Sequence, residues 1–192
     1  TDPNGFYGFY YDDKLIAGGA IISYNKEYGF MGLFIVHKDF RNKGIGKKLW
    51  HFRRDCLINR LNTNASIGMD GVLAMQPFYN KGGFNIAYRD ERYEFKSDTI
   101  PFSTNVDLIN KDDFEKIIEY DITYFGCQRT IFLKNWLQMP ESKAIKYYEN
   151  NKILGYAVIR KAETGCKIGP LFANNKKIAE ELFKSCLNIS IN

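Results

Sequence analysis

The chain has 192 residues, a length that allows one large domain or two small ones. With 45% hydrophobic and 26% charged residues, its composition is that of a folded soluble protein. The net charge of +5 suits an anionic ligand, but no basic run and no RNA-binding signature accompanies it, so no nucleic acid is expected as a partner.

The first half of the chain predicts strands, then a helix, then more strands. Residues 7–11 and 15–24, separated by Asp12-Asp13-Lys14, are typical of a strand, a tight turn and a strand. A second turn near 25–27 precedes "FMGLFIV", a short apolar run suited to a buried strand. Apolar side chains then recur at helical spacing and predict a helix over residues 44–59: Ile45, Leu49, Phe52, Cys56 and Leu57. We expect three further elements: a strand at 65–73, a short helix at 76–81 and a last strand at 84–95.

The second half predicts a similar set of elements in another order. Residues 97–104, with Pro101, are typical of a linker. Beyond them the patterns predict a short strand, two helices, three strands and a final amphipathic helix, at residues 106–109, 112–125, 129–137, 143–149, 153–161, 166–172 and 174–187.

Strand-turn-strand-strand-loop-helix therefore occurs twice, at residues 6–59 and 143–187. We interpret this as a diverged internal duplication. The expected fold is α/β of the mixed α+β kind, with a central, mostly antiparallel twisted sheet flanked by helices, in two tandem copies. The predicted domains are residues 1–97 and 98–192.

The cysteines and apolar runs exclude two other classes of protein. The four cysteines are widely spaced, form no C-x-x-C pair and have only His37 and His51 to join them, so no metal site is expected. Free thiols in a reducing cytoplasm are the simplest interpretation. No apolar run approaches membrane-spanning length and no signal peptide is present, so we expect a cytoplasmic location and no membrane partner.

The stretch "RNKGIGKKLW", residues 41–50, has the pattern of a phosphate site. It joins a strand that ends at Val36 to a helix that opens at Gly44. The first N–H groups of a helix lack intrahelical partners, and the helix dipole favours an anion there. Glycines at 44 and 46 would let a ligand approach the backbone, and the neighbouring Arg and Lys side chains would add donors. The alternative is that the glycines only permit a turn. Neither G-x-x-x-x-G-K-[ST] nor G-x-G-x-x-G is present.

Arg41-x-x-Gly44-x-Gly46, after "LFIV" and before "KKLWHFRRDCL", resembles motif A of the GNAT acetyltransferase superfamily, Gln/Arg-x-x-Gly-x-Gly/Ala. "PFYNKGGF" at residues 77–84 resembles the later Tyr-x-Lys-x-Gly-Phe segment of the same family. The resemblance covers residues 6–95. It implies acetyl-CoA as co-substrate, with its pantetheine along the strand and its pyrophosphate on the glycine loop. The implied cofactor-binding residues are Phe34, Ile35, Val36, Arg41, Asn42, Lys43, Gly44, Ile45, Gly46 and Lys47.

The resemblance also implies the chemistry. In this family an amine attacks the thioester directly, and a general acid protonates the departing thiolate. Tyr79 matches the tyrosine that often takes this role; the alternative is an aromatic ring packed over the cofactor without proton transfer. Gly83-Phe84 is expected to be structural. Val72 stands where many members carry an asparagine, which puts that cofactor contact in doubt.

No general base is evident in the sequence. Asp70, Glu27 and Glu91 are the possible cleft carboxylates, and of these Asp70 is the best, although a strand-end carboxylate paired with Arg or Lys is the alternative. His37 follows the strand and is either a surface residue or a catalytic one.

The second half resembles the C-terminal part of tandem GNAT proteins, through "ILGYAVIRKAETGCKIGPLFANN" and "FGCQRTIFLKNWL". Gly169-Pro170-Leu171 stands where the pyrophosphate loop would begin, but no Gly-x-Gly follows and Pro170 removes a donor, so this copy is not expected to bind CoA. Arg129 is either an anion contact or part of a surface ion pair.

The resemblance favours an N-acetyltransferase acting on a small-molecule or protein amine; its oligomeric state is open, with a dimer as one option. The alternative is a non-catalytic module that binds CoA or another protein.

Overall fold

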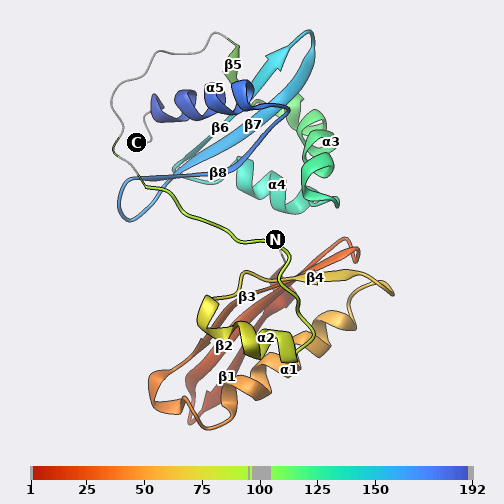
Figure 1. Ribbon diagram of the computed structural model, residues 1–192, viewed down its shortest axis with the longest axis vertical. Helices are drawn as coiled ribbons and strands as arrows, with labels where there is room; N and C mark the ends of the chain where they lie inside the picture. The colour runs from red at the N-terminus through yellow and green to blue at the C-terminus, as the bar shows by residue number, and fades with distance from the viewer. Residues whose placement is uncertain (1, 95, 97–104, 190–192) are drawn as a thin grey trace. The chain divides into compact units, whose positions relative to one another are not determined.

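The computed structural model describes residues 2–94, 96 and 105–189. The chain divides into two compact units, residues 1–92 and 93–192, each with its own sheet (Figure 1). The predicted boundary between residues 97 and 98, and the predicted linker at 97–104, lie outside the described residues.

The first unit contains one four-stranded sheet in the order β1-β2-β3-β4. β1, β2 and β3 pair antiparallel, and β4 joins β3 in parallel. Its elements are η1 Pro3–Gly5, β1 Phe6–Tyr11, β2 Lys14–Tyr24, β3 Tyr28–Val36, η2 Lys38–Phe40, α1 Ile45–Ile58, β4 Ser66–Gly68, η3 Leu73–Met75 and α2 Gln76–Lys81. The predicted strands at 7–11 and 15–24, the strand ending at Val36 and both helices are confirmed.

One face of this sheet is covered by helices α1 and α2 (Figure 1). Trp50 of α1 packs with Ile21 of β2 and Met31 of β3 in a buried cluster, and Phe78 of α2 joins it from the side. Large aromatic side chains thus supply much of the apolar area buried on folding, as expected for so aromatic a chain.

Two predictions about the end of the first unit were wrong. The strand predicted at residues 65–73 is only Ser66–Gly68. The last strand predicted at 84–95 does not form over residues 84–94, and Ile86, Tyr88 and Tyr93 there are exposed. Their alternating pattern resembles a half-buried strand, but a strand is stable only against a neighbouring edge. No strand in the described part of the chain pairs with this segment.

The second unit has an antiparallel sheet in the order β5-β6-β7-β8, covered on both faces (Figure 1). Its elements are β5 Val106–Leu108, η4 Lys111–Asp113, α3 Phe114–Phe125, α4 Thr130–Leu137, β6 Ser142–Glu149, β7 Lys152–Lys161, β8 Cys166–Ala173 and α5 Lys176–Leu187. α5 packs on one face through Ile178 and Leu182, whereas α3 and α4 cover the other through Ile117 and Leu133. Every element predicted here is confirmed to within three residues at each end.

The predicted duplication is visible in the structure. β1-β2-β3-α1 and β6-β7-β8-α5 have the same order and the same antiparallel pairing. In both units the pairing of the second and third strands is interrupted by an irregular step, between Gly18 and Ala20 and between Ala157 and Ile159.

A buried ion pair in the second unit should make its stability sensitive to acid. Lys146 Nζ lies 2.5 Å from both carboxylate oxygens of Asp113, and both side chains are buried. Burial raises the pKa of Asp113, but the N–H of Asn110 and the charges of Lys146 and Lys116 outweigh it and hold this pKa below its ordinary value. Because the unfolded carboxyl titrates near ~3.9, stability from the pair is complete at neutral pH and is lost as the pH falls below about 4.

We therefore expect the free energy of unfolding of the second unit to fall between about pH 4 and pH 2, as measured by urea titration. Asp113→Asn should be less stable than the parent at neutral pH and should lose less on acidification. Parallel pH curves for the two proteins would contradict this assignment.

Three general features complete the fold. All four cysteines are free thiols, with Cys127 and Cys186 buried. No helix in the described ranges is long and apolar enough to cross a membrane. Residues 2–94, 96 and 105–189 contain no group of three or more His, Cys, Asp or Glu side chains that could hold a metal ion.

Candidate functional site: the free edge of β3 and the loop before α1

The site begins where β3 and β4 separate. β4 pairs with β3 only through Tyr28, Gly29 and Phe30. From residue 31 to residue 36, no strand of the described chain pairs with this edge of β3, although β2 occupies the other edge. The backbone groups on this edge of β3 therefore have no strand partner.

An eight-residue loop leads from this edge to α1. The Nε of Arg41 donates to the carbonyl oxygen of Val36 at 3.0 Å, which ties the loop to the strand end. Asn42 and Gly44 have positive φ angles of 61° and 78°. Lys43 lies over the ring of Phe40, 5.3 Å from its centroid.

The N-terminus of α1 is open. Gly44 is its N-cap residue and has no side chain to accept a hydrogen bond, and the first intrahelical bond runs from Lys48 N to Gly44 O at 3.1 Å. The N–H groups of Ile45, Gly46 and Lys47 have no acceptor among the residues that the structure describes. A Cβ atom at Gly44 would meet nothing within 4 Å. Three unpaired donors, the helix dipole and open space match the requirements of a phosphate.

The predicted β3 residues divide between the two faces of the sheet. A Cβ atom on Gly46 would lie 3.4 Å from Val36 Cγ2 and 3.5 Å from Phe34, so these two side chains face α1. Ile35, 65% exposed, points to the opposite face. Only the backbone of Ile35 could therefore take part in binding at the edge.

Tyr79 lies on α2, with its ring against Gly71: a Cβ atom there would come within 2.7 Å of Tyr79 Cε2. Burial raises the pKa of the Tyr79 phenol, and the positive charge of Arg53 partly opposes this. Arg53 in turn lies 5.0 Å from the ring centroid of Phe34. The guanidinium whose charge acts on Tyr79 therefore lies against Phe34 of the predicted binding strand.

Arg53 is the residue that sequence reasoning missed. We expected Phe52 on the buried face of the helix, but Phe52 is 46% exposed and Arg53 is fully buried. The helical repeat contained the necessary information, because Arg53 lies four residues after Leu49 and four before Leu57, which are both fully buried. A charged residue in the middle of an apolar stripe is the pattern to search for.

The candidate bases do not gather at this site. Glu27 lies in the turn between β2 and β3, at the end of β3 remote from the loop. Asp70 is exposed beyond the end of β4; partial burial, and then the charge of Asp90, raise its pKa. The expected Arg or Lys partner of Asp70 is not found among the described residues. Glu91 lies in the irregular segment after residue 84.

Two smaller predictions have outcomes here. His37 is exposed, accepts a hydrogen bond from Asp39 N and packs against Phe40, as a surface residue does. Gly83, with a φ of 95°, turns the chain so that Phe84 packs against Trp50, which confirms the structural role expected for this pair.

The second unit has a closed counterpart of this site. Gly169 and Pro170 lie inside β8 and not in a loop, and only two residues separate β8 from α5. The side chain of Asn175 caps α5 by accepting from Ile178 N at 3.0 Å. Because this helix start is occupied by its own cap, it lacks the open donors found at α1.

One of the two alternatives for Arg129, a surface ion pair, is wrong. Arg129 is 8% exposed and makes two hydrogen bonds to the fully buried Asp121, at 2.8 and 2.7 Å. The flanking aromatic residues Phe125 and Phe132 exclude water from the guanidinium.

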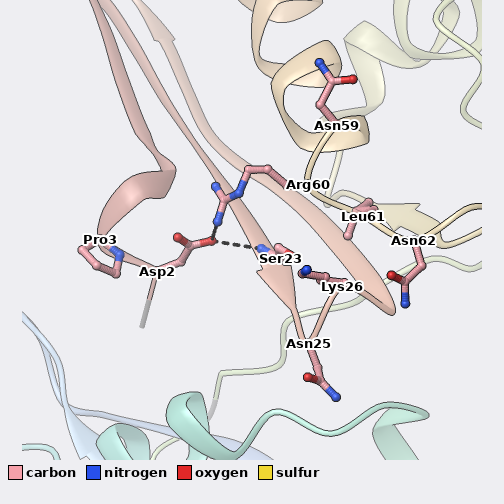
Figure 2. Close-up of a pocket in the computed structure, with 9 residues that line it drawn as sticks. All are labelled: Asp2, Pro3, Ser23, Asn25, Lys26, Asn59, Arg60, Leu61 and Asn62. Carbon is pink, nitrogen blue, oxygen red and sulfur yellow. Dashed lines mark hydrogen bonds and ion pairs between the residues drawn. The ribbon is translucent and has the colours of Figure 1, made fainter.

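A separate pocket of about 580 Å³ lies at the other end of β3 and α1 (Figure 2). Its lining residues are Asp2, Pro3, Ser23, Asn25, Lys26, Asn59, Arg60, Leu61 and Asn62. Arg60 is paired with Asp2, which also accepts from Ser23 N, so two of the three charged side chains that line this pocket are already paired. The donor pattern at α1 makes the loop, and not this pocket, the candidate site.

Known proteins of the same kind match both units. Two family models, each of an acetyltransferase (GNAT) domain, match residues 2–86 and 117–191. The holothin acyltransferase of Pseudoalteromonas sp. (strain SANK 73390) is 27% identical over 97% of this chain and 62% of its own length. The uncharacterized N-acetyltransferase YitH of Bacillus subtilis (strain 168) is 22% identical over 79% of this chain and 54% of its own length.

The crystal structure of a putative acetyltransferase from Pyrococcus horikoshii superimposes with a TM-score of 0.82 at 25% identity. The match covers 96% of this chain and 61% of that one. The chain thus spans less than two thirds of the length of each of these three relatives.

Proposed function

We propose that this chain, which belongs to the GNAT acetyltransferase superfamily as a tandem of two such domains, binds acetyl-CoA on its first unit and transfers the acetyl group to an amine. The observation that carries the proposal is the free edge of β3 beside an uncapped α1. A thioester carrier needs both features, an edge for its amide-bearing arm and a donor cluster for its pyrophosphate.

Different residues of the loop contribute backbone donors, loop positioning and positive charge to pyrophosphate binding. The N–H groups of Ile45, Gly46 and Lys47 donate to its oxygens, and the α1 dipole adds to the attraction. Arg41 holds the loop against β3, while the exposed Lys43 and Lys47 supply positive charge. Phe34, Ile35 and Val36 present their backbone to the amide-bearing arm.

Tyr79 acts as the general acid. Bound acetyl-CoA supplies the activated acetyl group, and the chain must supply a proton for the sulfur that leaves. A phenol whose pKa is raised by burial stays protonated at neutral pH and is therefore able to donate. The side chain lies on α2, which covers the same sheet face as α1 (Figure 1).

The second unit does not bind a second CoA in this proposal. Its α5 begins with a side-chain cap and no glycine loop. The acceptor is an amine carried by a small molecule or a protein, and the first unit works on one acetyl-CoA per chain.

Isothermal titration calorimetry tests the first step. Acetyl-CoA should bind with one site per chain and a dissociation constant below about 1 mM, in the range of typical substrate constants. Adenosine, which lacks the pyrophosphate, is the control ligand and should bind far more weakly. A folded chain that binds neither ligand at this concentration would sink the proposal.

Transfer is tested separately, by release of the CoA thiol in the presence of a panel of small amines and a peptide. Tyr79→Phe should keep acetyl-CoA binding and lose about a hundredfold in kcat or more. Binding without thiol release for any amine would instead support the non-catalytic module.

A further inference from the structure

Arg53 is a buried cation without a carboxylate partner in the described part of the chain. It is fully buried in α1. Its Nη1 donates to Gly32 O at 2.7 Å and to Ala20 O at 3.1 Å, while its Nε is buried and finds no acceptor among the described residues. Among the described residues, Tyr79 is the one ionisable group whose charge affects the pKa of Arg53. A buried guanidinium held in this way is costly and calls for a reason.

The fold does not require a cation at this place. In the second unit the matching interface between α5 and β7 is filled by Ile178, Leu182 and Cys186. In the first unit the chain instead makes room for the charge. A Cβ atom on Gly19 would lie 1.9 Å from Arg53 Nη1 and 2.8 Å from Leu33 O, so a residue without a side chain is needed there.

The two carbonyls that Arg53 holds belong to one residue pair, Ala20 on β2 and Gly32 on β3, at one edge of a break in the sheet. Between the pairs Gly18–Ile35 and Ala20–Gly32 the register of β2 and β3 is irregular, and Leu33 takes a φ of 46°. A ladder interrupted in this way leaves backbone groups in need of partners. Arg53 supplies a donor to each of the two strands at this edge of the break, and so fixes where β3 bends within its free edge.

The positive charge of Arg53 also acts on the Tyr79 phenol. Burial raises the pKa of the phenol, and Arg53 is the charged group among the described residues that lowers it. Conversely, burial lowers the pKa of Arg53 and Tyr79 opposes that change. An arginine nonetheless stays protonated throughout the pH range in which proteins work.

We propose that Arg53 is a positioning residue for acetyl transfer, which holds the bend of β3 against the bound thioester and whose positive charge acts on Tyr79. The inference rests on the proposed function. In the step concerned, the O–H bond of Tyr79 breaks and an S–H bond forms on the departing thiolate. The phenolate left behind is stabilised by the Arg53 charge, and it regains a proton from water as the attacking amine releases one to water.

The test compares Arg53→Met, Tyr79→Phe and the double variant in the full chain. Arg53→Met should lower kcat about tenfold or more with little change in the KM for acetyl-CoA, and should move the alkaline limb of the kcat profile to higher pH. In the Tyr79→Phe background, Arg53→Met should lower kcat much less, because the phenol on which the Arg53 charge acts is absent. Gly19→Ala, on a different strand, should reproduce the loss by displacing the guanidinium.

A measurement without substrate separates this inference from the proposed function. The ultraviolet absorbance of tyrosinate, taken as the difference between chains with and without Tyr79, follows the ionisation of this phenol alone. Arg53→Met should raise the pKa seen in this titration, whereas Arg53→Lys, which keeps the charge, should hold it near the parent value.

The proposal would be overturned if the losses of kcat in the two single variants add up in the double variant, or if Arg53→Met leaves the pKa of Tyr79 unchanged. Either result would count even if acetyl-CoA binds and reacts. A shifted titration in a chain that does not bind acetyl-CoA would uphold the Arg53–Tyr79 coupling and reject the acetyltransferase. If Arg53→Met does not fold, Arg53→Gln keeps an amide donor for the strand carbonyls without the charge, and the same comparison applies.

Discussion

Replacing Gly44 with valine should weaken acetyl-CoA binding by about a hundredfold, which corresponds to about 2.7 kcal/mol. Gly44 has a φ of 78°, a conformation that costs a residue with a side chain about 1–2 kcal/mol and suits β-branched residues least. The loop can relieve that strain only by rotating the following peptide units. Such a rotation would turn the N–H groups of Ile45 and Gly46 away from the pyrophosphate, and each charge-assisted hydrogen bond lost is worth about 1.5–3 kcal/mol.

Gly165→Val is the matched control. Gly165 also has a positive φ, 67°, and open space around its missing side chain, but it lies in the hairpin between β7 and β8. Both variants should lose similar stability in thermal unfolding, and only Gly44→Val should lose affinity by calorimetry. Lys48→Ala, on the exposed first turn of α1, should change little. Equal losses of affinity in all three variants would mean that Gly44 merely permits a turn.

Arg129→Met should destabilise the second unit by about 3–5 kcal/mol, the range for breaking one side of a buried ion pair. Asp121 is fully buried and accepts hydrogen bonds from Arg129 and from the Tyr156 hydroxyl. Without the guanidinium its charge would remain buried on the inner side of α3, with only the Tyr156 hydroxyl among these donors left to it. Urea unfolding at neutral pH, followed by a probe in the second unit, measures the change.

An exposed ion pair in the same unit provides the comparison. Lys161 and Glu141 are 2.7 Å apart with about half of each side chain exposed, and Lys161→Met should destabilise the unit far less than Arg129→Met, because water screens this pair. Removing both buried charges together, as Asp121→Leu with Arg129→Met, should recover part of the loss. If Arg129→Met were no worse than Lys161→Met, the buried network would contribute no stability of its own.

The sequence predicted the candidate site well where local patterns carry the information. The glycine loop, the strand before it and the helix after it depend on spacing and on turn chemistry, which are properties of adjacent residues. The second unit was predicted almost completely for the same reason, since its strands alternate regularly and its hairpin turns are short and polar. The duplication also followed from comparing one half of the sequence with the other.

The errors arose where a residue's environment comes from distant parts of the chain. Residues 84–94 alternate like a strand, yet without a neighbouring edge they form none. Arg129 looked like a surface residue because its partner Asp121 and the rings around it come together only when α3, α4 and β8 pack. Phe52 and Arg53 exchanged their expected places because burial depends on which side of α1 meets the sheet.

By itself, then, the sequence determined most of the elements, the tandem arrangement and the loop that suits a pyrophosphate, because these depend on periodicity, glycines and charges within short windows. Only the tertiary structure decided that β3 has a free edge beyond Phe30, that α1 starts uncapped while α5 is closed by Asn175, and that Arg53 donates to a carbonyl of each of two neighbouring strands. Strand pairing, helix capping and the burial of charge are settled between segments far apart in the chain, and no local pattern specifies them.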